Sequence, residues 1–254
     1  MSSRVELQNV SVIYRLLTVE DYNLKRQIVR GFGRRRHGLV TPLHALSDIN
    51  LSLNDGDRLQ VVGSNGSGKT TLLRVIAGAL APTSGALLTR GRVLPLLGGP
   101  GATLDGTLTG RENIVQVGML LGESPFHMQN LVHDIAEFSG LRDRLNTPVS
   151  TYSSGMAARL RFSIVTSLKP DILVMDEGIA STADPEFSQR AKIRLEQFQN
   201  QVSIVIWSSF SHSLKNLATK LLSLQNGRMV KETMSATGHS LENVTMGQDS
   251  TTLQ

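Results

Sequence analysis

The chain has 254 residues, 40% of them hydrophobic, which is enough to build one large α/β domain or two small ones. It contains no cysteine, so a disulfide-stabilised scaffold is excluded and a reducing compartment is expected. The net charge of +5 lies within residues 1–40, where eight Lys and Arg face three acidic residues, which argues against a general nucleic-acid-binding surface.

The amino-terminal part predicts strands that are interrupted by a basic insert. Residues 5–13 have strand character that ends at Tyr14, and residues 43–53 alternate apolar and polar side chains. The insert, residues 15–41, is basic and contains several glycines. No apolar run approaches the roughly 18 residues that span a bilayer, so we expect a soluble chain that works at a membrane only through a partner.

The most informative stretch lies between a short buried strand at 58–62 and a helix at 71–77. It fits G-x-x-x-x-G-K-[ST], the phosphate-binding loop, and reads Gly63-Ser64-Asn65-Gly66-Ser67-Gly68-Lys69-Thr70, followed by Thr71. Glycines let the backbone curl closely around phosphate, and the helix that follows presents its positive end there. We expect Lys69 to reach the β- and γ-phosphates of a nucleotide and the Thr70 hydroxyl to bind Mg²⁺.

Helices are predicted over most of 111–145 and again after a serine-rich stretch. Thr109 and Glu112 form a capping-box pattern at the start of the first region. The stretch Tyr152-Ser153-Ser154-Gly155 precedes an amphipathic helix whose apolar stripe starts at Met156 and which ends at Pro170. Its serines can simply cap that helix, or the hydroxyls and free N–H groups can bind a phosphate.

Two acidic residues follow a fully apolar strand at 172–175. Carboxylates at the carboxyl end of such a strand face the ligand crevice of an α/β sheet. Asp176 is expected to hold Mg²⁺, and Glu177 to act as the general base on the attacking water. The alternative is a strand that runs into an acidic turn, and the phosphate loop makes the catalytic interpretation the better one.

The remaining elements complete an alternation of strands and helices. We expect a helix at 185–199, a buried strand at 202–207, a helix at 213–220 and a hairpin turn at Gln225-Asn226-Gly227. From about Glu232 the chain is polar and rich in Ser, Thr and Gly. The predicted division is therefore one domain at 1–231 and a disordered tail at 232–254.

Several of these motifs together resemble the nucleotide-binding subunit of an ABC transporter. The Ser-Ser-Gly-Met form of the serine-rich stretch is typical of the branch that exports bacterial O-antigen, capsule and teichoic acid. The resemblance covers about residues 4–230. The motifs that carry it are Tyr14, the phosphate loop, and residues 109–114, 152–156 and 172–179.

The resemblance implies an α/β fold of the P-loop NTPase type. It would have a RecA-like core, an antiparallel β portion near the N-terminus and a helical subdomain across about 100–160. It also implies an ATPase that powers export of a lipid-linked polysaccharide through a separate permease dimer. Such a subunit sits on the cytoplasmic face of the inner membrane and has no nucleic-acid partner.

The same resemblance assigns binding roles. Tyr14 would stack on adenine. Two copies would pair head to tail around two ATP molecules, with Ser153, Ser154, Gly155 and Met156 of one copy facing ATP on the other. Ser154 and Gly155 would contact its γ-phosphate. DNA-repair ATPases with the same signature need long coiled-coil insertions, and the sequence has no such heptad segment.

The chain departs from the family pattern at three places. The usual glutamine is missing from the region Leu97-Gly98-Gly99-Pro100-Gly101. Ala183 stands where an aspartate is usual, and Asp184 follows. Counting back from the hairpin puts Ser209 at the place of the switch histidine, whereas His212 fits only with a lengthened loop. With Ser209 there, hydrolysis would be slow, and the alternative function is an ATP-dependent clamp that barely hydrolyses.

Two interpretations of the basic insert remain open. It can be a solvated loop. In polysaccharide exporters it resembles a short helix at the cytosolic mouth of the channel, where cations would meet anionic lipid head groups, each contributing about 1 kcal/mol. The pyrophosphate of a lipid-linked glycan is the other anion expected there.

Overall fold

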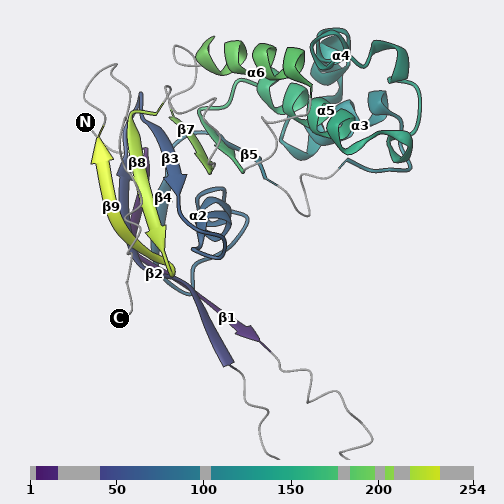
Figure 1. Cartoon of the computed structure of the whole chain (residues 1–254). Coiled ribbons are helices and arrows are strands. Elements are labelled where there is room, and N and C mark those ends of the chain that lie inside the picture. The colour runs from purple at the N-terminus through teal and green to yellow at the C-terminus, as the bar shows by residue number, and fades with distance from the viewer. Residues whose placement is uncertain are drawn as a thin grey trace, which may run out of the picture.

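The computed structural model describes residues 4–16, 41–97, 104–176, 184–197, 204–208 and 218–234. Within these ranges the chain forms two β-sheets and a group of helices (Figure 1). None of the helices described has both the length and the apolar character that crossing a membrane requires.

The first sheet is antiparallel and has three strands in the order β2-β1-β4. Their bounds are β1 Val5–Leu16, β2 Thr41–Leu53 and β4 Ser84–Thr89. Both β1 and β2 are longer than the sequence predicted, because their ladder continues until Leu16 lies opposite Thr41. The far ends of these two strands extend as an arm beyond the other described residues, and the sequence between Leu16 and Thr41 is attached at its tip (Figure 1).

The second sheet has six strands in the order β5-β6-β7-β3-β8-β9. Neighbouring strands from β5 to β8 are parallel, and β9 is antiparallel to β8. The strands are β3 Arg58–Val62, β5 Val93–Leu96, β6 Ile172–Met175, β7 Ile204–Ser208, β8 Lys220–Gln225 and β9 Arg228–Met234.

Strands β6 and β7 are buried on both faces, which is typical of the fully apolar strands of a parallel sheet. Along β6, Ile172 and Val174 join a core shared with α2 (Lys69–Ile76) and the first sheet, whereas Leu173 and Met175 join a core shared with the other helices. Strand β7 alternates in the same way, because successive side chains of a strand point to opposite faces. The predicted α/β class, with an N-terminal antiparallel portion, is confirmed.

The other helices pack together beside the second sheet (Figure 1). Their bounds are α3 Gly110–Leu120, α4 Pro125–Ser139, α5 Ser154–Ser167 and α6 Pro185–Gln197. The predicted capping box is confirmed: the Glu112 N–H donates to the Thr109 side chain, and the Thr109 N–H donates to the Glu112 carboxylate. Three phenylalanines join α4, α5 and α6: Phe138, Phe162 and Phe187.

Two predictions near the C-terminal end of the sequence are wrong. Most of the helix expected at 213–220 lies outside the described residues, but its predicted end is wrong, because Lys220 already begins β8. The polar tail does not begin at Glu232, which lies in β9 opposite Leu222. Strand β9 is an edge strand, so polar side chains are tolerated and local composition does not reveal it. The hairpin turn is confirmed, with Asn226 and Gly227 both at positive φ.

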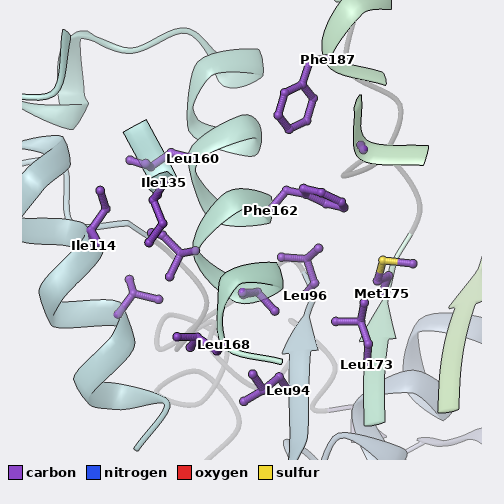
Figure 2. Packing of buried hydrophobic residues seen from close by; sticks show 14 of the residues in the cluster. Leu94, Leu96, Ile114, Ile135, Leu160, Phe162, Leu168, Leu173, Met175 and Phe187 are labelled. Atoms are coloured by element: carbon purple, nitrogen blue, oxygen red, sulfur yellow. The ribbon is translucent and has the colours of Figure 1, made fainter. Parts of the chain in front are cut away.

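Phe162 should be one of the most costly side chains to truncate. Figure 2 shows it beside Phe187, in a core that also contains Leu96 and Met175, and the two rings meet edge to face at 5.7 Å. We expect Phe162→Ala to lower the free energy of unfolding by about 3–5 kcal/mol, measured by denaturant titration. Phe126→Ala is the control, because the Phe126 side chain is 74% exposed. Equal losses in the two variants would contradict this account of the core.

Candidate functional site

The glycine-rich stretch forms a tight loop between β3 and α2, which the sequence predicted. Gly68 lies at φ 106, and a Cβ there would be 2.6 Å from the backbone carbonyl oxygen of Ala45 in β2. Only glycine, which has no Cβ, leaves room for β2 to lie this close to the loop. The hairpin turn supports the loop from the other side, because the Gly227 N–H donates to the Ser67 carbonyl oxygen at 2.9 Å.

Lys69 begins α2 and folds over its own loop. Its ammonium group donates to the carbonyl oxygens of Gly63 at 2.8 Å and Ser64 at 3.0 Å, and the side chain is nearly buried. The loop residues Ser64, Asn65 and Gly66 are exposed. A cation held against an exposed turn at a helix start is an arrangement that attracts phosphate.

Asp176 lies at the carboxyl end of β6, next to the start of α2. The Thr70 hydroxyl donates to one of its carboxylate oxygens, Oδ2, at 3.1 Å, although the two residues are far apart in the sequence. The structure therefore brings together the two predicted metal-binding residues. Thr71 follows in α2 and is half-buried.

Ser208 is a member of this site that sequence reasoning missed. Its hydroxyl donates to the other oxygen of Asp176, Oδ1, at 2.6 Å, and the residue is 1% exposed. Strand β7 lies directly beside β6, with Trp207 opposite Met175. A polar residue that ends an apolar strand was the available signal, but the neighbour of that strand could not be known from the sequence.

Tyr14 lies in β1 opposite Leu43 of β2, and it is half-buried. Its side chain packs against the core that contains α2. Ala45, two residues beyond Leu43, contacts the phosphate loop at Gly68, so the β1–β2 ladder brings Tyr14 toward that loop. Stacking of Tyr14 on adenine stays a prediction.

The serine-rich stretch caps α5. The Ser153 hydroxyl accepts a hydrogen bond from the Met156 N–H at 3.2 Å, and Ser153 and Ser154 are exposed whereas Gly155 and Met156 are half-buried. Helix α5 lies among the other helices, apart from α2 (Figure 1). The structure does not place this stretch in the same site as the phosphate loop of its own chain, and phosphate binding by it stays a prediction.

Asp184 connects the start of α6 to α5. Its carboxylate accepts the N–H groups of Glu186 and Phe187, which start α6, and pairs with the Arg159 guanidinium at 2.6 Å. The Phe187 N–H, followed by the charge of Arg159, holds the pKa of Asp184 below its ordinary value of 3.8. Arg159 is a second residue that the sequence did not single out.

The lowered pKa of Asp184 predicts how stability depends on pH. A carboxylate whose pKa is lower in the folded than in the unfolded chain stabilises the fold at pH values above its unfolded-state pKa. This contribution is lost as the pH falls through the folded-state pKa. We therefore expect Asp184→Asn, which keeps a capping side chain, to lower the melting temperature near pH 6. The difference in melting temperature between the variant and the wild type should shrink as the pH falls below 3.8, the ordinary pKa of an aspartate. Melting curves between pH 7 and pH 3 measure it, and a constant difference would contradict the prediction.

Several predicted residues lie outside the described part of the chain. They include two of the proposed catalytic residues, Glu177 and Ser209, and the alternative His212. Most of the region that lacks glutamine, Ala183, and the insert from residue 17 to 40 also lie outside it. Their predicted roles stay predictions.

Comparison with known proteins agrees with this geometry. A sequence model of the ABC transporter family matches residues 46–180. The chain is 36% identical over 232 residues to the O-antigen export system ATP-binding protein RfbE of Yersinia enterocolitica, covering 89% of this chain and 96% of that protein. It is also 36% identical over 187 residues to the teichoic acids export ATP-binding protein TagH of Shouchella clausii, covering 73% of this chain and 51% of the relative.

A third relative is the O-antigen export system ATP-binding protein RfbB of Myxococcus xanthus, 36% identical over 203 residues, covering 79% of this chain and 46% of the relative. The chain thus spans about half the length of TagH and RfbB. Among solved structures, the dimeric structure of a post-hydrolysis state of an ATP-binding cassette bound to ADP and Pi superposes with a TM-score of 0.70 at 17% identity, covering 91% of this chain and 98% of the other. The chain belongs to the ABC transporter family, and its fold is that of an ATP-binding cassette.

Proposed function

We propose that this chain binds ATP with Mg²⁺ and hydrolyses it to power export of a lipid-linked cell-surface polysaccharide through a separate permease dimer. One observation carries the catalytic part of the proposal: Thr70, the last residue of the phosphate loop, lies in hydrogen-bond contact with Asp176. A hydroxyl at a phosphate-binding helix start in contact with a carboxylate at the end of a parallel strand is an arrangement that suits a nucleotide and its metal.

The donor set suits Mg²⁺ bound with ATP. Mg²⁺ prefers oxygen ligands, keeps several waters and is commonly held by one or two protein groups together with substrate phosphates. The Thr70 hydroxyl and the Asp176 carboxylate supply such oxygens. No larger cluster of metal-binding side chains occurs in the described ranges, and a phosphate-assisted site does not need one. When bound, the cation would neutralise charge on the β- and γ-phosphates.

Residues of the chain itself would carry out the remaining steps. Lys69 would leave the carbonyl oxygens that it now contacts and bind the phosphates. Glu177 would take a proton from the attacking water. Ser154 and Gly155 of a second copy would cover the γ-phosphate, so that ATP joins two copies head to tail. With Ser209 in place of a switch histidine, turnover is expected to be slow.

The export step is supported by the relatives. RfbE and RfbB are named as O-antigen export ATP-binding proteins, and TagH as a teichoic acid export protein. We propose the same class of cargo here, with the chain lying peripherally on the cytoplasmic face of the inner membrane. The basic insert leaves the tip of the β1–β2 arm and would face anionic head groups or the glycan pyrophosphate.

Two measurements test this function. The purified full chain should release phosphate from ATP in the presence of Mg²⁺, and deletion of its gene should abolish surface polysaccharide that a plasmid copy restores. Polysaccharide that persists after deletion would overturn the export proposal, whereas the absence of ATP binding by the folded chain would overturn the catalytic one. A chain that binds ATP without measurable turnover would favour the clamp.

A further inference from the structure

The carboxyl ends of three neighbouring strands meet at Asp176. Strand β3 leads into the phosphate loop, β6 leads into Asp176, and β7 ends at Ser208. Ser208 lies beside Val61 of β3 in the ladder, and its neighbour Trp207 lies opposite Met175. Strands β5 and β7 lie on opposite sides of β6, so Ser208 approaches the Asp176 carboxylate from the β7 side.

The two oxygens of the Asp176 carboxylate accept hydroxyl hydrogens from opposite partners. Thr70 donates to Oδ2 at 3.1 Å, and Ser208 donates to Oδ1 at 2.6 Å. The shorter bond comes from the more deeply buried residue, because Ser208 is 1% exposed whereas Thr70 is half-buried. Bonds of this length from a hydroxyl to a carboxylate are among the stronger hydrogen bonds in proteins.

The donors of these two bonds would have different roles when a cation binds. Thr70 is expected to coordinate the cation through a lone pair of its hydroxyl oxygen, and its hydrogen can still be donated to Asp176. Thr70 is therefore both an expected ligand and a partner of the carboxylate, whereas Ser208 is a partner only. The bond from Ser208 lies on the other oxygen and can persist. It would then keep the carboxylate oriented toward the cation or toward a water bound to it.

We infer that Ser208 is a positioning residue that fixes the Asp176 carboxylate for the magnesium–nucleotide complex. The inference rests on the proposed ATPase function. Removing an outer hydrogen-bond partner of a metal-binding carboxylate typically weakens metal affinity by about 10–100-fold. Ser208 therefore acts on the metal step and has little effect on binding of ATP alone.

Valine and threonine at position 208 make a matched pair, because they differ only by a methyl in place of the hydroxyl. Both are β-branched and suit a strand. Two affinities are measured. Electron paramagnetic resonance gives the affinity of Mn²⁺ for the full chain with bound ATP. Titration in EDTA gives the affinity of a fluorescent ATP analogue. Fluorescence of Trp207, the one tryptophan of the chain, reports that each variant is folded.

We expect Ser208→Val and Ser208→Ala to weaken Mn²⁺ binding by about 10-fold or more, and Ser208→Thr to stay within about twofold of the wild type. Analogue binding in EDTA should change little in every variant. Ser139→Ala is the control for loss of a buried hydroxyl, since Ser139 donates to the Ala136 carbonyl of its own helix.

Three results would overturn the inference. They are equal Mn²⁺ affinity in the Val and Thr variants, an equal loss of analogue binding in EDTA, and a loss of Mn²⁺ affinity in Ser139→Ala as large as in Ser208→Ala. A wild-type chain that binds neither the analogue nor Mn²⁺ with ATP would instead overturn the proposed function, so the two failures are distinguishable.

Discussion

Glu177→Gln is expected to slow ATP turnover by about 10²–10⁴-fold, the usual contribution of a positioned general base. Glutamine has nearly the same shape as glutamate but cannot accept the proton of the attacking water. Glu177 directly follows Asp176, whose contacts with Thr70 and Ser208 do not involve it. The ATP site should therefore stay intact, and ATP that is bound but not hydrolysed should hold two copies together.

Phosphate release measures the turnover, and light scattering after size-exclusion chromatography measures the pairing. Glu186→Gln is a suitable control, because Glu186 is an exposed carboxylate in the first turn of α6. Turnover that is unchanged in Glu177→Gln would show that Glu177 is not the base. A wild-type rate already as low as that of the variant would favour the ATP-dependent clamp.

Lys69→Ala is expected to impair both ATP binding and turnover. The ammonium group is held against the loop by two carbonyl oxygens, and a phosphate would replace neutral acceptors by a charged one. Loss of a hydrogen bond to a charged group costs about 1.5–3 kcal/mol, or about 10–150-fold in ATP affinity. Loss of a preorganised donor in the transition state slows the chemical step by about 10²–10³-fold.

Titration with a fluorescent ATP analogue and phosphate release at saturating ATP separate these two effects. Lys192→Ala is the control, because Lys192 is an exposed lysine that pairs with Glu196 on α6. If Lys69→Ala bound ATP as tightly as the wild type, the phosphate loop would not be the nucleotide site, and the proposed function would lose its basis.

The phosphate loop could be recognised from the sequence because its parts are contiguous. A strand, a turn that requires glycine at Gly68 and a helix that starts at Lys69 follow one another without interruption. The capping box at Thr109 and the turn at Asn226 were predictable for the same reason: each depends on residues a few positions apart. Where the decisive partner was a neighbouring strand, as for the edge strand that contains Glu232, local composition misled.

The sequence by itself determined the chemistry that is available: a lysine, a hydroxyl and a carboxylate in motifs that indicate ATP and Mg²⁺. Only the tertiary structure decided that β7 lies beside β6, that Ser208 therefore reaches Asp176, and that Arg159 pairs with Asp184. Each pair of parallel strands joins segments far apart in the chain, and both faces of the pair must be covered, here by helices on one side and by α2 with the first sheet on the other. No local pattern encodes that arrangement.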